Sequence, residues 1–262
     1  ERQAYGWSAP GQEREPASWW MRTTGTRFRT ELESGGYGYR TSGYRNTMQV
    51  GADLSACRCG GTLYRKGIFA GTALLKADNY GSGGQKAGRS ELFGMGGGMY
   101  ASVERRNRWY AEAVVQANTW DLSTSVVSTG TKPGAKTWSM AASLEGGLSV
   151  KASEAFRLEP QAQVVWQRID GYELQVAPSS LARVDAMTGL FGRIGLTGMV
   201  MPKGWCLSPM FELNALREFA DAAKVAWVQT GQQYSVKADR TWLGGALGVV
   251  SRNSRPECLE YF

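Results

Sequence analysis

The chain has 262 residues, among them 34 glycines, 10 tryptophans and 11 tyrosines. This enrichment in glycine and aromatic residues, with few long apolar runs, is typical of strands and turns, and an all-β barrel of this size often forms one domain. The absence of histidine excludes a Ser-His-Asp triad and zinc sites built with histidine, and no apolar stretch reaches the 18 or so residues that a transmembrane helix needs.

The formal net charge is +7, but lysine and arginine are scattered in small groups such as 104–108. Nucleic-acid binding usually needs a basic helix or a dense basic stripe, and the sequence has neither. The charge therefore favours solvated turns and loops near a charged lipid surface over a nucleic-acid partner.

Four cysteines are present, at Cys57, Cys59, Cys206 and Cys258. The spacing of Cys57 and Cys59 is one residue shorter than the usual C-x-x-C metal or redox spacing. We therefore expect no metal and no cofactor. A disulfide between Cys57 or Cys59 and another loop remains an open alternative in an oxidising compartment.

Apolar and polar residues alternate with a period of two in many segments, as they do along β-strands. We expect ten strands, in chain order: Ser18–Arg29, Met48–Ser55, Thr62–Asp78, Glu91–Val103, Trp109–Trp120, Thr137–Val150, Phe156–Gln167, Met187–Val200, Trp205–Phe219 and Arg240–Ser251. Several of these carry closely spaced glycines, as at 94–98, which mark bends or close approach in a strand and leave room inside a barrel.

The alternation gives each strand one apolar and one small or polar face. In Thr137–Val150, for example, Trp138 and Leu144 share one face while Ser139 and Glu145 share the other. Carboxylates, amides and arginines are costly in a protein core but suit a wet pore. The pore-lining residues that we predict are Glu112, Gln116, Asn118, Glu145, Glu159, Gln161, Gln163, Gln167, Arg193, Glu212 and Asn214.

Segment length separates a membrane barrel from a soluble one. Strands of soluble proteins usually run five or six residues, whereas membrane strands need about nine to eleven, and several segments here reach ten or more. The pattern therefore favours an all-β transmembrane antiparallel up-and-down β-barrel. A soluble β-sandwich or lipocalin-like barrel is the alternative.

Tryptophans lie near the predicted strand ends, as in the aromatic girdles of outer-membrane barrels. They are Trp19, Trp20, Trp109, Trp120, Trp138, Trp166, Trp205 and Trp242, of which we expect Trp109, Trp138, Trp166 and Trp205 at the membrane interface. Short connections near 105–107 and 152–155 alternate with long ones at 79–89, 123–136, 171–185 and 221–238, which matches the periplasmic and extracellular ends of such a barrel.

Seven short motifs, in order along the chain, resemble the C-terminal β-barrel translocator domain of autotransporters, the proteins of type V secretion. Each motif alone is weak, but together they span roughly residues 18 to 250. They are 19–22 followed by 48–53, 67–71 leading to 76–78, 97–102, 110–112, 143–147, 158–163 and 191–195.

This resemblance implies a twelve-stranded barrel in the outer membrane of a Gram-negative bacterium, with a linker inside the pore. Residues 1–17 would be the linker and residues 18–262 the barrel, which would anchor an N-terminal passenger and assist its export. The implied partners are outer-membrane lipid and lipopolysaccharide, the chain's own passenger domain and the barrel-assembly machinery, with no nucleic acid. We expect a monomer.

Some members of the family cut the passenger inside the pore with an asparagine of the linker and carboxylates of the lumen. Residues 1–17 contain no asparagine, so we expect no enzyme activity, and Glu112, Glu145 and Glu159 are interpreted as lumen groups that satisfy each other or basic partners. A stand-alone outer-membrane pore or receptor without a passenger remains the alternative.

The sequence departs from the family pattern at both ends. Only ten strands and a stub at 255–262 are evident, so that either closure with fewer strands or a shortened chain would account for the count. Residues 5–11 include glycine and proline, which are poor residues for the interior of a linker helix.

Overall fold

The computed structural model describes residues 19–34, 37–105, 108–177, 180–200, 207–219, 223–228, 233–236 and 241–251. The predicted segment 1–17, Trp205, Cys206 and Cys258 lie outside these residues. The strands are β1 (Trp19–Ser34), β2 (Tyr37–Cys59), β3 (Thr62–Tyr80), β4 (Lys86–Arg105), β5 (Trp109–Val126), β6 (Gly134–Leu148), β7 (Val150–Lys151), β8 (Phe156–Ile169), β9 (Tyr172–Ala177), β10 (Ser180–Val184), β11 (Met187–Val200), β12 (Leu207–Glu218), β13 (Ala223–Trp227), β14 (Gln233–Val236) and β15 (Thr241–Ser251). The described part of the chain holds no helix long and apolar enough to cross a membrane.

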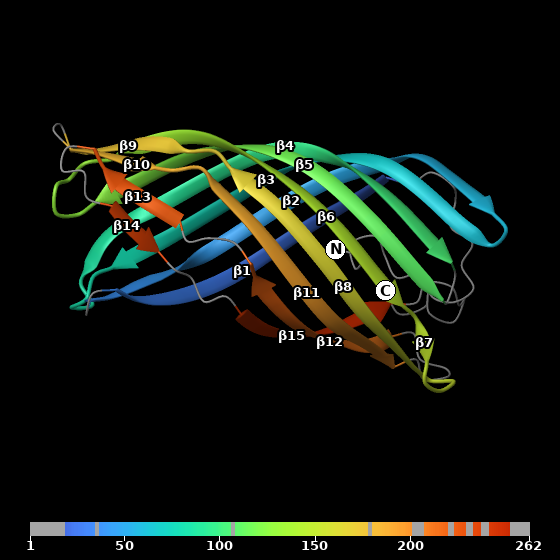
Figure 1. Ribbon diagram of the computed structural model, residues 1–262. Helices are drawn as coiled ribbons and strands as arrows, with labels where there is room; N and C mark the ends of the chain where they lie inside the picture. Colours follow the sequence, from blue (N-terminus) through green and yellow to red (C-terminus); the bar gives the residue numbers. More distant parts are fainter. Residues whose placement is uncertain are drawn as a thin grey trace.

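One large antiparallel sheet forms most of the molecule. Its strand order is β1-β2-β3-β4-β5-β6-β8-β11-β12-β15, with the short β7 paired to β8. Figure 1 shows this sheet curving into an open half-barrel, with β1 and β15 at its two edges. Within the described ranges these two edge strands are not paired with each other.

The all-β, antiparallel, up-and-down arrangement predicted from the sequence is confirmed, and each of the ten predicted segments overlaps a strand of the large sheet. The strands from β1 to β8 that belong to the main path of the sheet are longer than predicted, and β2 has 23 residues and β4 has 20. Both exceed the roughly nine to eleven residues needed to cross a bilayer, so the N-terminal half of the sheet extends well beyond one membrane thickness.

Two of the predicted long connections contain short strands, which the sequence did not predict. The segment 171–185 holds β9 and β10, and 221–238 holds β13 and β14, which together form a four-stranded sheet in the order β14-β13-β10-β9. The connections predicted at 79–89 and 123–136 shrink to 81–85 and 127–133, because β3 to β6 continue into them. In Figure 1 the second sheet lies at one end of the half-barrel, away from β7.

The opposite end has tight turns. Gly60 and Gly61 join β2 to β3 with positive φ values of 55° and 81°, the backbone that a two-residue hairpin turn requires. The β4–β5 turn is closed by the Arg108 amide, which donates to the Arg105 carbonyl at 3.0 Å, and residues 152–155 join β7 to β8. Short turns at one end and longer connections at the other are the pattern of an outer-membrane barrel.

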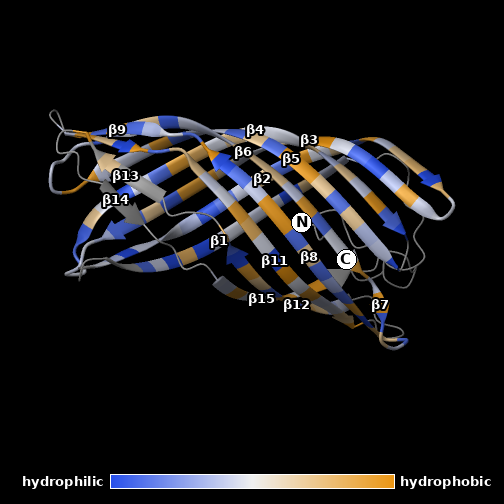
Figure 2. Ribbon diagram, viewed as in Figure 1, coloured by the Kyte–Doolittle hydropathy of each residue, from blue (hydrophilic) through white to orange (hydrophobic). Residues whose placement is uncertain are grey.

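The large sheet has two chemically different faces, and Figure 2 shows hydrophobic and hydrophilic residues alternating along its strands. We call the face that carries the buried side chains of Tyr110, Glu145, Glu159 and Thr197 the inner face, and the opposite face the outer face. On β4, the outer positions from Phe93 to Val103 carry no charge and lie between Glu91 and Arg105.

Close packing across the inner face depends on glycine. A Cβ atom on Gly67 of β3 would collide with the ring of Tyr100, which lies beside it on β4. Tyr100 is 4% exposed, and its hydroxyl donates to Asp53 on β2. The glycine therefore lets an aromatic ring lie flat on the neighbouring strand and aims its hydroxyl across the sheet.

Candidate functional site

The strand register sets one row of polar residues side by side on the inner face. Glu112 of β5 lies opposite Glu145 of β6, Glu145 opposite Gln163 of β8, and Gln163 opposite Arg193 of β11. Directly opposed residues on one face of a sheet lie close enough for their side chains to interact. Four of the predicted pore-lining residues thus share one row across four strands.

Arg193 is the centre of this row. Its Nε donates to Gln163 Oε1 at 3.0 Å, its Nη2 to Glu145 Oε2 at 2.8 Å, and its Nη1 to Glu212 Oε1 at 3.3 Å and Asn214 Oδ1 at 3.0 Å. The Arg193 side chain is 14% exposed, Glu145 6% and Glu212 17%. A buried guanidinium requires carboxylate partners, and two of them satisfy it here.

Tyr110 completes the surroundings of Glu145. Its hydroxyl donates to Glu145 Oε1 at 2.7 Å, so each carboxylate oxygen of Glu145 accepts one hydrogen bond. The ring of Tyr110 lies over Gly147, where a Cβ atom would collide with it. Sequence alternation places Tyr110 on the face of Glu112, but we did not single it out as a site residue.

A second group adjoins the first on the same face. Gln161 Nε2 donates to Glu159 Oε1 at 3.2 Å and to Thr197 Oγ1 at 3.1 Å. Glu159 and Thr197 are each 2% exposed and lie opposite each other on β8 and β11. Next to them on β12, Asn214 Nδ2 donates to Glu212 Oε1 at 2.7 Å, so the two β12 partners of Arg193 also bind each other.

The other predicted residues share the inner face but stay apart from this cluster. Gln116 and Asn118 lie farther along β5, opposite Gly98 and Gly96 of β4, and Gln167 lies opposite Gly189 of β11. All eleven residues therefore occupy one face, as the alternation predicted. That this face lines a pore stays a prediction.

A cluster missed by the sequence reasoning lies across β1 to β4. Trp20 Nε1 donates to the Tyr100 hydroxyl at 3.2 Å, Tyr100 donates to Asp53, and Arg65 Nε lies 4.0 Å from Asp53 Oδ2. The side chains of Arg65 and Asp53 are 9% and 3% exposed. Only the alternation of 48–55, which sets Asp53 on its polar face, hinted at this cluster.

Two of the tryptophans assigned to the aromatic girdle are on the inner face instead. Trp20 packs against Phe69 and Tyr100, and Trp120 Nε1 donates to Ser139 Oγ at 2.7 Å. Neighbouring residues of a strand point to opposite faces, so an assignment shifted by one residue places a side chain on the wrong face.

The expected interface residues that the structure describes, Trp109, Trp138 and Trp166, are on the outer face with 38%, 42% and 36% exposure. Trp109 begins β5 beside the tight turn, whereas Trp138 Nε1 donates to Asp170 Oδ2 at 3.0 Å beside the long connection after β8. On β6 the uncharged outer positions run from Trp138 to Leu148. Ten residues of a strand tilted by about 40° span about 25 Å, the height of the apolar band of a membrane barrel.

The inner face carries charged and hydrogen-bonded side chains. Cys57 and Cys59 are free and exposed, and the described residues form no group of three or more histidine, cysteine, aspartate or glutamate side chains able to hold a metal ion. The Arg193 and Glu159 groups form a charged surface whose side chains are hydrogen-bonded to one another.

The family model described as the autotransporter β-domain matches residues 19–255. The BrkA autotransporter of Bordetella pertussis is 26% identical over 209 residues, covering 78% of this chain and 20% of that protein. The pertactin autotransporter of Bordetella bronchiseptica is 24% identical over 218 residues, covering 81% and 23%. The chain thus spans about a fifth of the length of these curated relatives.

Solved structures show the same fold. The transport unit of the autotransporter AIDA-I from Escherichia coli superposes with a TM-score of 0.71 at 20% identity, covering 94% of this chain and 82% of that one. The β-domain of the Bordetella autotransporter BrkA superposes with a TM-score of 0.60 at 22% identity, covering 91% and 100%.

Proposed function

The chain belongs to the autotransporter β-domain family of outer-membrane proteins, and from that premise we propose that it anchors an N-terminal passenger and assists its export. The observation that carries this proposal is the family match over residues 19–255 on a sheet with one polar, hydrogen-bonded face and one uncharged outer band. A stand-alone pore is not favoured, because the matched relatives are much longer proteins named as autotransporters.

We propose that residues 18–262 form the barrel and residues 1–17 the linker that joins it to the passenger. The inner face then lines the pore, with Glu112, Gln116, Asn118 and the Arg193 and Glu159 groups in contact with water and the passing chain. Polar groups that already bond one another present a wet surface to which an unfolded peptide adheres weakly, which suits transit rather than retention.

We also propose that the domain has no catalytic activity of its own and acts as a monomer. Its carboxylates are held by structural partners, since Glu145 is bound by Arg193 and Tyr110, and the chain has no histidine for imidazole catalysis. The barrel-assembly machinery and outer-membrane lipid, including lipopolysaccharide, complete the set of proposed partners.

The test is surface display in a Gram-negative host. A protease-sensitive reporter is fused before residue 1, and intact cells are treated with protease or with an antibody against the reporter. The expected result is a reporter exposed on the cell surface and a domain in the outer membrane that migrates differently on a gel before and after boiling.

The matched control deletes the hairpin Lys86–Val126, which removes two central strands of the sheet, and should leave the reporter inside the cell. A correctly assembled domain whose reporter stays in the periplasm would contradict the export function. If such a domain also conducts ions in a planar bilayer, the stand-alone pore becomes the better description.

A further inference from the structure

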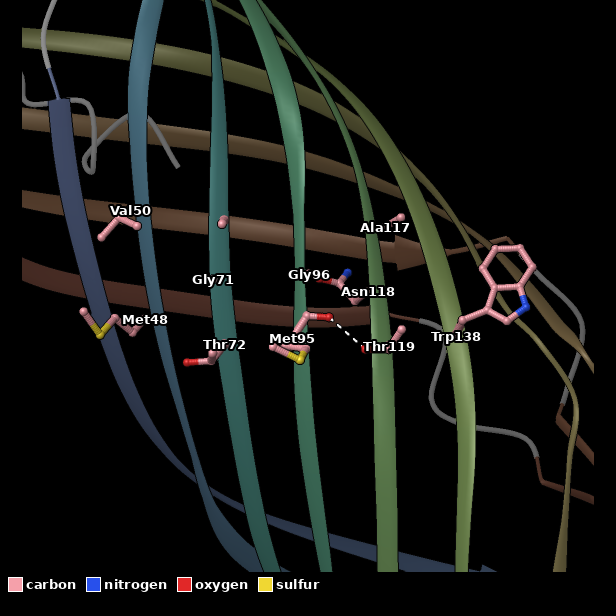
Figure 3. A pocket seen from close by; sticks show the side chains of 11 residues that line it. Met48, Val50, Gly71, Thr72, Met95, Gly96, Ala117, Asn118, Thr119 and Trp138 are labelled. Carbon is pink, nitrogen blue, oxygen red and sulfur yellow. Dashed lines mark hydrogen bonds between the residues drawn. The ribbon is translucent and has the colours of Figure 1, made fainter.

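The outer face of the sheet has an apolar hollow of about 640 Å³ that the translocator function does not use. Figure 3 shows its lining residues arranged across successive strands, from β2 to β6. Ala70 and Ala117 leave the space, and Met48, Met95 and Trp138 border it. Since neighbouring strands lie about 4.8 Å apart, a trough across five strands is about 19 Å long.

The trough runs from the edge of the uncharged band of outer-face residues into the interior of that band. On β6 the trough begins at Trp138, and the next outer-face residue toward the strand end is the exposed Lys136. On β4 one more outer-face residue separates Met95 from the charged Glu91. A trough of this length and direction matches one acyl chain, because each leaflet contributes about 15 Å to the hydrocarbon core.

A cation lies where the headgroup of such a lipid would be. Arg168 is exposed on the outer face of β8, opposite Met140, and is therefore the diagonal neighbour of Trp138, about 7–8 Å away. In the described part of the chain Arg168 forms no ion pair. The nearby Asp170 carboxylate accepts a hydrogen bond from Trp138 Nε1, which fixes the indole at the mouth of the trough.

Trp138 and Arg168 lie at the long-connection end of β6 and β8, the extracellular end of an outer-membrane barrel. We propose that the trough seats one acyl chain of a phosphate-bearing lipid of the outer leaflet, with Arg168 holding the phosphate and Trp138 lying at the interface. This inference rests on the proposed placement of the domain in the outer membrane, but not on export of a passenger.

The test counts lipids on the full chain, extracted from outer membranes in detergent and delipidated, by native mass spectrometry. The probe is a hexa-acylated glycolipid with two phosphates, titrated beside the same glycolipid after removal of its phosphates. We expect one molecule of the phosphorylated glycolipid to bind to each chain more tightly than any further molecules do. Ala117→Phe should weaken it about tenfold, equivalent to two methylene groups losing contact, and Arg168→Gln about fivefold.

Two matched variants control for the change of residue. Ala113→Phe adds the same ring to the outer face of β5 outside the trough, and Arg105→Gln removes a cation at the other end of β4; neither should change binding. With the dephosphorylated glycolipid, Arg168→Gln should lose its effect. Heat-modifiable gel migration confirms that each variant is folded. If Ala117→Phe does not fold, Ala117→Leu fills the trough with a smaller side chain.

Equal binding by Ala117→Phe and Ala113→Phe, or an unchanged affinity of Arg168→Gln for the phosphorylated lipid, overturns the proposal. A dimer that disappears in Ala117→Phe also overturns it, because a second copy of the chain would then occupy the trough. If the lipid binds as expected while a fused reporter is not exported, only the translocator function fails.

Discussion

Arg193 Nη2 donates to Glu145 Oε2 at 2.8 Å although β8 lies between their strands. The guanidinium reaches past Gln163, which it also binds, and joins three strands into one unit. Since the same side chain binds Glu212 and Asn214 on β12, a single residue ties together β6, β8, β11 and β12.

Replacing Arg193 by methionine should destabilise the domain strongly. The change keeps much of the side-chain volume but leaves Glu145 and Glu212 without their cation, and breaking a buried pair in this way costs about 3 kcal/mol. The measurement is urea unfolding in detergent, followed by tryptophan fluorescence. Adding Glu145→Gln to this variant should restore part of the loss, and a double variant no more stable than Arg193→Met would contradict the pairing.

Gly67→Ala should impair folding because the new methyl group would collide with the Tyr100 ring and the Ala52 carbonyl. Overpacking of this kind costs about 1–3 kcal/mol. Gly38→Ala is the control, since nothing lies within 4 Å of a Cβ atom at that position. The folded fraction is read from heat-modifiable migration, and equal fractions in the two variants would show that the ring moves aside freely.

Val115→Lys should oppose insertion into a bilayer. Val115 lies on the outer face in the middle of the uncharged positions of β5 and is 49% exposed. Lysine at the bilayer midplane of a membrane barrel costs about 2–4 kcal/mol, compared with about 0–1 near the interface. Ser123→Lys, beyond Asp121 on the same strand and face, should be nearly neutral in the same vesicle-folding assay. Equal costs would mean that the outer face does not contact lipid.

The end of the β3–β4 hairpin should respond to acid. Lys86 Nζ lies 2.7 Å from Asp78 Oδ1, and this close ion pair with Lys86, together with the positive charge of Arg89, holds the pKa of Asp78 below its ordinary value. A depressed pKa means that the ionised carboxylate stabilises the folded hairpin above the pKa of the unfolded chain. That contribution is lost as the pH falls through the lower, folded pKa.

Amide hydrogen exchange at residues 81–85 measures this effect. Protection should fall as Asp78 becomes protonated, and Asp78→Asn should show the low-pH behaviour at every pH. Because the Lys86 and Asp78 side chains are 46% and 32% exposed, water screens the pair and the change should be small. Protection that falls equally in Asp78→Asn on acidification would assign the pH response to another group.

The sequence was sufficient to predict the strands that have one wet and one apolar face. In Trp109–Trp120 the alternation identified both the strand and the face of Glu112 and Gln116. It failed in 30–44, where threonine, serine, arginine and glutamate occupy both faces, so the extended ends of β1 and β2 left no periodic signal. The backbone pairing of β1 with β2 continues through those ends, and backbone pairing is invisible in side-chain hydropathy.

The polar site was predictable as a face but not as a cluster. Alternation set Glu145 and Arg193 on polar faces, whereas their meeting depends on the register of β6, β8 and β11, which no single strand encodes. Trp19 and Trp20 are consecutive, so the sequence did not show which indole turns inward, and only the partner strands decide it.

The pairing of β10 with β13 joins two connections that are separated along the chain by the whole β11–β12 hairpin. Ala182 lies opposite Trp227, and Val184 opposite Val225. An insertion that shifts one of these connections must be matched in the other, so their lengths should vary together among related proteins. An antibody against that surface would bind a discontinuous epitope, and a short peptide copied from either connection alone would not reproduce it.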